Sequence, residues 1–432
     1  MRRIIIAVAL IVCVTAVGFA LERFPPPEFD SGYQFPDVIT PGPRETILEY
    51  ADIAVLVLTL AFGAYLTLKK RSRSDILMLA VFGVLYFGFY RKGCICAIGA
   101  IQNVSLAIFN PEYALPLSAA AFFAVPLVFA LFFGRVFCAG ICPLGAVQEI
   151  VLLRPVKVPK WLDDTLSVFP FIYLGAAVLF AATGAAFVIC RFDPFVQFFW
   201  LGGETVMLAV GVGTVLFSMF VGRPYCRYVC PLSALFRLTA PLARWQPQIG
   251  TGECINCHLC ADACPYGAIL PPTPESAGED LTVDRRRLGL ILLLVPVMLA
   301  AGGYLGHLSG PVLAKVHPKV LLADRLWLEE QGVVEGMTEM TEAFDYLGEP
   351  SITAYKEAAA IREQFDIGSI ILGIWIGLVF GVKLITSSIR RHRDEYSIDQ
   401  AQCVECGRCY DSCPADVKDK QPTTAASAGE IS

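Results

Sequence analysis

The sequence has few charged residues. Only 17% of its 432 residues are Asp, Glu, Lys or Arg, whereas soluble domains carry about 25%. This deficit argues against an ordinary soluble protein, and the 56% share of hydrophobic residues indicates a membrane protein. The net charge of -5 is small, so the composition gives no sign of nucleic-acid binding.

Cysteine, in contrast, is abundant, with 16 residues. Disulfide frameworks of secreted proteins are short and rich in loops, and this chain is neither. Ten cysteines from Cys226 onward stand in C-x-x-C or C-x-x-x-C spacings. The sequence therefore favours metal ligation over disulfide bonding.

Eight apolar stretches have about the length of a membrane span, for which a helix needs about 20 residues. They cover residues 4–21, 49–68, 76–90, 117–134, 167–189, 203–221, 288–306 and 368–386. The first also fits a cleaved signal peptide. The third is short, and short or interrupted spans often mark a binding site in the membrane.

Basic residues cluster in the short loops between these stretches. The clusters lie at residues 2–3, 69–73, 154–160, 285–287 and 390–393. All five fall on one side if the chain crosses the membrane eight times, and the positive-inside rule places that side in the cytoplasm. We therefore expect a multi-pass protein of the bacterial cytoplasmic membrane with both termini inside.

The segment "CINCHLCADACP" (254–265) fits two patterns. Its start, Cys254-Ile-Asn-Cys257-His258, matches haem c attachment. However, Cys260 and Cys264 complete the C-x-x-C-x-x-C-x-x-x-C-P run of bacterial ferredoxins. The segment lies on the predicted cytoplasmic side, whereas haem c is attached outside. It therefore predicts a [4Fe–4S] site, with His258 as an ordinary loop residue.

The same run returns as "CVECGRCYDSCP" (403–414). In two-cluster ferredoxins, the fourth cysteine of each run ligates the other cluster. We therefore predict two [4Fe–4S] clusters with crossed ligands: Cys254, Cys257, Cys260 and Cys413 for one, and Cys403, Cys406, Cys409 and Cys264 for the other. A zinc site would use two C-x-x-C pairs, and two complete ferredoxin runs disfavour it.

Two further segments resemble each other, "GRVFCAGICPLGAVQ" (134–148) and "GRPYCRYVCPLSALF" (222–236). Each places Gly-Arg and C-x-x-x-C-P at the inner end of a predicted span. We name Cys138, Cys142, Cys226 and Cys230 the inner quartet and predict that they bind one further Fe–S cluster. The alternative is that small thiols pack between helices. Arg135 and Arg223 either neutralise cluster charge or extend to the membrane interface.

A degenerate copy, "RKGCICAIGAIQ" (91–102), follows the third span, and Cys190 in "ICRFDPF" follows the fifth. Spans three and four, and spans five and six, therefore form an internal two-helix repeat. Cys94, Cys96 and Cys190, the outer cysteine set, are candidates for an additional metal site at the outer face, with Asp193 or a water as fourth donor. A disulfide is the alternative in that compartment.

The predicted outer loop, residues 307–366, has no Gly-rich phosphate loop and is too short for an independent catalytic domain. Its segments 317–331 and 352–364 have helical spacing. His307 lies just outside the seventh span. It is a candidate quinol proton acceptor or axial ligand, or else an ordinary interfacial histidine.

These patterns predict an α-helical integral membrane protein with about eight transmembrane helices and a split cytoplasmic ferredoxin-like 2[4Fe–4S] module. The expected parts are a first helix or signal anchor (1–21), an extracytoplasmic segment (22–48), a cysteine-bearing core (49–238), the first ferredoxin half (239–285), a transmembrane hairpin (286–388) and the second half (389–432).

From about residue 49 onward, the sequence resembles the NosR/NapH-type family of membrane-bound polyferredoxins. The resemblance rests on the paired "GR..C...CP" span ends, "CRFDPF", the two ferredoxin runs and "HPKVLLADRLWLEEQGVV". The last stretch is nearer to the branch associated with nitrous oxide reductase. That branch carries an N-terminal flavin domain. Here only residues 22–48 separate the first two predicted spans, with no flavin-attachment threonine motif, so a separate flavin or cytochrome subunit is the expected outer partner.

The resemblance implies electron transfer between quinol or cytoplasmic donors and an extracytoplasmic partner. A transmembrane electron conduit is the leading hypothesis. A quinol dehydrogenase that draws on the quinone pool is the second. A redox sensor or maturation factor is the third, and the number of predicted clusters disfavours it because a sensor needs only one. The sequence leaves the direction of electron flow open.

Overall fold

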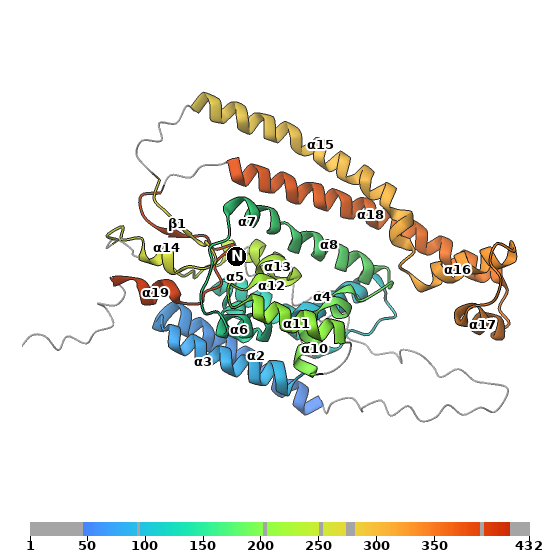
Figure 1. Cartoon of the computed structure of the whole chain (residues 1–432), viewed down its shortest axis with the longest axis horizontal. Helices are drawn as coiled ribbons and strands as arrows, with labels where there is room; N and C mark the ends of the chain where they lie inside the picture. Colours follow the sequence, from blue (N-terminus) through green and yellow to red (C-terminus); the bar gives the residue numbers. More distant parts are fainter. Residues whose placement is uncertain are drawn as a thin grey trace, which may run out of the picture.

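The computed structural model describes residues 46–92, 96–201, 205–249, 254–273, 281–388 and 393–414. The first predicted span and nearly all of the segment 22–48 lie outside these residues. The described part is almost entirely helical (Figure 1). This agrees with a composition in which apolar helix-forming residues dominate.

Five helices in the described residues are long and apolar enough to cross a membrane. Three of them are composite or bent by a local irregularity, and two are long single helices. They are α2 (Thr46–Tyr65) with the π-helix η1 (Leu66–Lys70), α3 (Arg73–Gly83) with the π-helix η2 (Val84–Tyr90), α7 (Lys160–Leu166) with α8 (Phe169–Ala182), α15 (Leu281–Ala314) and α18 (Ser351–Ser388).

The predicted sixth span, 203–221, contains the 13-residue helix α11 (Thr205–Phe217). Together with α10 (Pro194–Trp200), which it meets at 98°, α11 would make a sixth crossing. The predicted fourth span is α5 (Leu117–Phe133), which has 17 residues and Pro126 in its interior. A further apolar helix, α4 (Ala97–Phe109), lies in a stretch where no span was expected. The described residues therefore support fewer full-length spans than the eight predicted.

Shorter elements connect the spans and carry the cysteines. They are the π-helix η3 (Phe137–Ile141), α6 (Pro143–Ile150), α9 (Val188–Phe192), α12 (Pro224–Tyr228), α13 (Pro231–Thr239) and the 3-10 turn η4 (Ala240–Leu242). Isolated π-helical turns within α-helices occur mostly at functional sites. Here η3 contains one of the inner quartet cysteines, Cys138.

The helices α15 and α18 form a long antiparallel hairpin whose seam consists of glycines (Figure 1). A Cβ added at Gly302 would collide with the carbonyl of Gly373, and one at Gly377 would lie 2.5 Å from the Met298 carbonyl oxygen. Small residues at such spacing let transmembrane backbones approach closely, because packing rather than hydrophobicity drives association in lipid. The segment between α15 and α18 forms α16 (Pro318–Glu330) and α17 (Glu339–Tyr346). The helical spacing predicted for 317–331 and 352–364 is thus confirmed.

The two ferredoxin runs come together at the opposite end of the molecule (Figure 1). The strands β1 (Ile269–Leu270) and β2 (Ser397–Ile398) pair antiparallel, with Ile269 opposite Ile398. The helices α14 (Leu259–Ala263) and α19 (Arg408–Ser412) contact each other. Segments on either side of the α15–α18 hairpin therefore build one small module.

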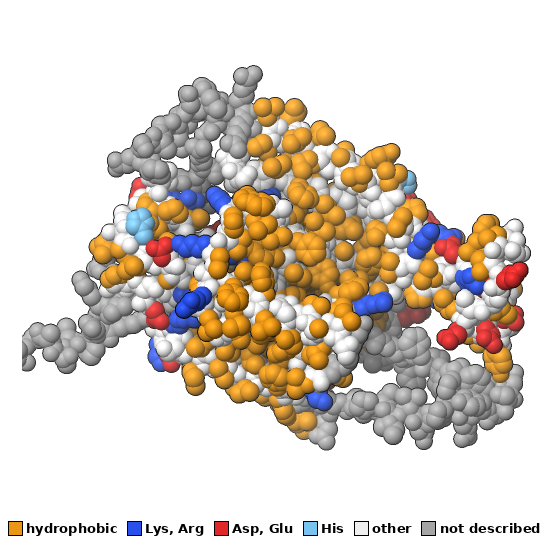
Figure 2. All heavy atoms as spheres, in the orientation of Figure 1, with side chains coloured by type: hydrophobic (Ala, Val, Ile, Leu, Met, Phe, Trp, Pro, Cys, Tyr) orange, Lys and Arg blue, Asp and Glu red, His pale blue; other side chains and the backbone are white. Residues whose placement is uncertain are grey.

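Figure 2 shows a broad area of hydrophobic side chains across the middle of the molecule, with charged side chains gathered towards its two ends. In the part of α15 whose side chains are described, several leucines are largely exposed, such as Leu290 and Leu293. Exposed apolar surface of this extent indicates a lipid-facing belt.

Candidate metal centres

The second ferredoxin run forms a cavity with one cysteine from the first. Cys403, Cys406 and Cys409 line this space together with Cys264. All four thiols are free. This is the crossed combination expected from the sequence, with the fourth ligand drawn from the other run.

The remaining cysteines of the module lie close to this cavity. Cys254, Cys260 and Cys413 pack into one apolar cluster that also includes Cys264 and Cys409. Burial raises the pKa of the Cys260 thiol, and the neighbouring thiolates of Cys413, Cys254 and Cys257 raise it further. Four thiolates held this close repel one another, so the arrangement favours a cationic metal group between them.

The two runs share an unusual backbone. In each, two residues adopt the left-handed region at equivalent positions: Asn256 and His258 in the first run, Glu405 and Gly407 in the second. Alternating left- and right-handed residues turn successive N–H groups towards one concave side, which suits an anionic cluster. His258 begins α14 and shares a hydrogen bond with the Tyr396 hydroxyl, which agrees with the loop role expected of it.

The inner quartet is brought together by two equivalent turns. Cys142 and Cys230 are the N-cap residues of α6 and α13, each followed by a proline in the first helical turn. All four thiols are free and buried. Burial raises the pKa of Cys230, and so do the nearby thiolates of Cys226, Cys142 and Cys138. The four thiols therefore lie near one another, and a set of four cysteine sulfurs is typical of an Fe–S cluster.

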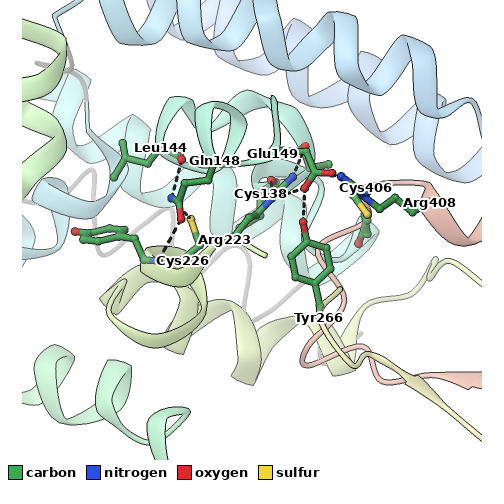
Figure 3. A network of polar contacts seen from close by, with 12 residues as sticks. Cys138, Leu144, Gln148, Glu149, Arg223, Cys226, Tyr266, Cys406 and Arg408 are labelled. Atoms are coloured by element: carbon green, nitrogen blue, oxygen red, sulfur yellow. Dashed lines mark hydrogen bonds and ion pairs between the residues drawn. The ribbon is translucent and has the colours of Figure 1, made fainter. Parts of the chain in front are cut away.

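Glu149 lies between the inner quartet and the ferredoxin module (Figure 3). Its side chain is 3% exposed, and its Oε2 accepts from Arg223 Nε at 3.0 Å. Its Oε1 accepts from Arg408 Nε, also at 3.0 Å, and from Arg73 Nη2. The Tyr266 hydroxyl donates to it as well. Burial alone would raise the pKa of Glu149, but these arginines outweigh burial and lower the pKa to about 2.

This network contacts loops that carry cysteines of the inner quartet and of both ferredoxin runs. Arg223 donates to the carbonyls of Cys138 and Ala139. Arg73 donates to the carbonyl of Cys406 at 3.0 Å. Tyr266 follows directly after the Cys264-Pro265 end of the first run. One buried carboxylate thus joins the inner quartet to both ferredoxin halves.

The two Gly-Arg pairs contact one ferredoxin half each. The Arg135 amide donates to Glu405 Oε1 at 2.6 Å, and a Cβ at Gly134 would collide with the same carboxylate. A Cβ at Gly222 would lie 3.0 Å from the Tyr266 ring. Arg135 and Arg223 are only 2% and 1% exposed, so they do not extend to the membrane interface. Their place beside the cysteines agrees with neutralisation of cluster charge.

The outer cysteine set is partly described. Cys94 lies outside the described residues. Cys96 and Cys190 both line a hollow with about 990 Å³ of empty volume, together with Asp193. Both thiols are free. His307, at the end of α15, is exposed and pairs with Asp366 of α18, Nδ1 to Oδ1 at 2.6 Å.

Among the described residues, no three His, Cys, Asp or Glu side chains converge closely enough to hold a single metal ion.

Sequence reasoning missed Glu149, Tyr266 and Gln148. Gln148 accepts from the Tyr225 amide at 3.1 Å and donates to Cys226 Sγ at 3.4 Å. The available signal was the polar pair Gln148-Glu149 in an otherwise apolar segment that directly follows a cysteine motif. A buried charge in such a place needs a partner, so it marks a network.

Comparison with known proteins supports these assignments. Two models described as 4Fe-4S binding domains match the chain, one at residues 115–160 and 204–247 and the other at 247–270 and 396–419. The first covers both Gly-Arg cysteine motifs and the second both ferredoxin runs. Together with the apolar helices, they define a membrane-bound iron–sulfur protein of electron transport.

Several curated proteins are similar to parts of this chain. The regulatory protein NosR of Stutzerimonas stutzeri is 28% identical over 50% of this chain and 32% of its own length. The protein NirI of Paracoccus denitrificans is 33% identical over 33% of this chain and 23% of its own. The methylamine utilization ferredoxin-type protein MauN of Methylobacillus flagellatus is 24% identical over 35% and 56%, respectively. These similarities support the resemblance of the chain to NosR/NapH-type membrane-bound 4Fe-4S ferredoxins.

The chain spans about a third or less of the length of the NosR and NirI relatives. No solved structure matches it.

Proposed function

We propose that this protein carries electrons across the membrane through iron–sulfur clusters, between a cytoplasmic or quinol donor and an extracytoplasmic redox partner. The observation that carries the proposal is the Glu149 network. It fixes the cysteine loops of the inner quartet and both ferredoxin runs against one another. Centres held at a fixed, short separation are what stepwise electron transfer needs, because the hydrocarbon core of about 30 Å is too thick for one direct step.

In this proposal, the ferredoxin module holds two [4Fe–4S] clusters with the crossed ligands given above. The inner quartet holds a third Fe–S cluster. The ferredoxin end faces the cytoplasm, and α16 and α17 face outward. The basic segment 69–73 supports this orientation, because it lies at the ferredoxin end of α2 and α3. The cysteine-bearing spans form an internal repeat, and eight spans in all keep both termini inside the cytoplasmic membrane.

The direct test is electron flux across a sealed membrane. The protein is reconstituted anaerobically into liposomes that contain a membrane-impermeant reductant, and reduction of an impermeant acceptor outside is followed optically. We expect flux with the unchanged protein and with Cys13→Ser, a control for the loss of a thiol. Cys142→Ser combined with Cys230→Ser should reduce the flux to that of empty liposomes while the ferredoxin clusters remain.

Iron and sulfide analysis with redox-titrated electron paramagnetic resonance completes the test. The ferredoxin module alone accounts for about eight irons, and the inner quartet raises the count to about ten or twelve. A count near eight, or full cluster content without flux, would overturn the conduit. The second outcome would favour a sensing role, since two of the relatives carry the name regulatory protein.

A quinol dehydrogenase is the second candidate, because the exposed His307–Asp366 pair provides a proton acceptor at the outer end of the hairpin. Reduction of the clusters by a water-soluble quinol, abolished by His307→Ala, would support it. An unchanged rate in that variant would exclude His307 from the role.

A further inference from the structure

We propose that Cys96, at the start of α4, and Cys190 and Asp193, in α9 and at the start of α10, bind an iron–sulfur cluster as the structural counterpart of the inner quartet. This inference is independent of electron flux, because cluster content is measurable without a redox partner. Each thiol releases its proton to solvent when its sulfur binds iron.

The first support is a repeated glutamine contact. The sequence Cys-x-x-Gly-Ala-x-Gln ends at Gln102 in one copy and at Gln148 in the other. Gln148 Oε1 accepts from the Tyr225 amide at 3.1 Å, and Gln102 Oε1 accepts from the Ile189 amide at 2.5 Å. In both copies, that amide belongs to the residue just before a cysteine. The same side chain therefore positions the same loop at both ends of the repeat.

The second support is a repeated glycine. A Cβ at Gly145 would lie 3.7 Å from Cys226 Sγ, and a Cβ at Gly99 would lie 3.3 Å from Cys190 Sγ. Both glycines occupy the third position after the motif cysteine. Their lack of a side chain leaves room beside the thiol in both places, which a ligand on the sulfur would require.

The third support is the residue before a helix-starting proline. In the inner quartet, Cys230 is the N-cap of α13 and precedes Pro231. In the outer copy, Asp193 is the N-cap of α10 and precedes Pro194. Asp193 therefore takes the place of the fourth quartet cysteine, and carboxylate oxygen is an established iron ligand type.

The surroundings of the Asp193 carboxylate also favour a role as a metal ligand. It is only 2% exposed. Its Oδ1 accepts from the Phe195 amide at 2.9 Å, but its Oδ2 has no hydrogen-bond partner, and neither does Gln102 Nε2. Buried polar atoms are rarely left without partners. Asp193 lines the same hollow as Cys96 and Cys190, so a metal group there would satisfy it.

The place of this site suits a relay to the inner quartet. Cys96 and Cys142 line one small apolar cavity with Phe87, Phe122 and Phe137. An apolar, closely packed separation excludes water and brings the two centres near each other. The outer cluster would thus be the neighbour of the inner one on the path outward.

The test compares anaerobically purified variants for iron, acid-labile sulfide and paramagnetic signals. We expect Cys96→Ser combined with Cys190→Ser to lose about two to four irons per chain, with the ferredoxin signals unchanged. Cys13→Ser is the matched control and should lose none. Equal iron and sulfide in both variants, or a Cys96–Cys190 disulfide found by mass spectrometry of the unreduced protein, would overturn the proposal.

Asp193→Cys addresses the case in which the double variant fails to fold. This substitution gives the site three thiols, with a thiolate at the position that corresponds to Cys230 of the inner quartet. It should keep the iron content and shift the spectrum and potential of one centre only, because a thiolate replaces an oxygen donor. A spectrum identical to that of the unchanged protein would mean that Asp193 is a helix cap and no ligand.

Discussion

Arg223 and Glu149 form a buried ion pair, Nε to Oε2 at 3.0 Å, whose side chains are 1% and 3% exposed. The arginine comes from the second Gly-Arg motif, and the glutamate follows the first. The pair therefore joins the two halves of the cysteine core directly, with no residue of the ferredoxin module between them.

Replacement Glu149→Gln should destabilise the protein by about 3–5 kcal/mol, because it leaves buried arginines without their counter-charge. Thermal unfolding in detergent, followed together with iron release, measures this. Glu357→Gln is the matched control, since Glu357 pairs with Lys319 at 2.8 Å on an exposed surface, where ion pairs contribute little. Equal melting temperatures for the two variants would contradict the central role of Glu149.

The crossed ligation makes opposite predictions for two double variants. Cys254→Ser with Cys413→Ser should remove one cluster, about four irons, because both residues serve the same centre. Cys254→Ser with Cys264→Ser should remove both, about eight irons. Iron analysis distinguishes them directly, and the reverse order would show that each run binds its own cluster.

The glycine seam of the hairpin should not tolerate side chains. Gly373→Val would force the α15 and α18 backbones apart, and we expect a loss of about 1–3 kcal/mol or more from overpacking. Gly213→Ala in α11 is the control, because a Cβ there has nothing within 4 Å. Thermal aggregation temperatures compare the two. Similar values would mean that the hairpin adapts without its close approach.

The N-terminus of α16 should loosen in acid. His317 Nδ1 accepts from the Lys319 amide at 3.1 Å, and burial, followed by the charge of Lys319, lowers the pKa of His317. The unfolded chain therefore binds the proton more readily than the folded one. The stabilisation by the cap is complete above the unfolded pKa of about 6.5 and is lost as the pH falls through the lower folded value.

Hydrogen exchange of the amides of residues 319–321 at pH 5.5 and 7.5, corrected for intrinsic rates, measures this loosening. We expect less protection at pH 5.5 in the unchanged protein and no difference in His317→Asn, which keeps a cap without a titrating group. The same pH dependence in both proteins would exclude His317 as its source.

The ferredoxin runs and the long spans could be predicted from short, continuous segments of the sequence. The ferredoxin runs were recognisable because their ligands stand within a few residues of each other, and the long spans because hydropathy is a property of a continuous segment. The network around Glu149 could not be predicted from the sequence, because its partners Arg73, Tyr266 and Arg408 are distant in sequence and only the folded chain brings them together. The predicted sixth span, residues 203–221, did not include α10, which packs against α11 only in the folded chain.

The separation of the ferredoxin runs by the α15–α18 hairpin has a consequence for biosynthesis. Cys264 leaves the ribosome early, whereas Cys403, Cys406 and Cys409, which line the same cavity, are made only after the entire hairpin. If the proposed cluster binds here, the cavity can close around it only after α18 has been made. Iron delivery to this module would then follow the synthesis of the whole hairpin, and a chain that stalls within the hairpin would carry no finished ferredoxin.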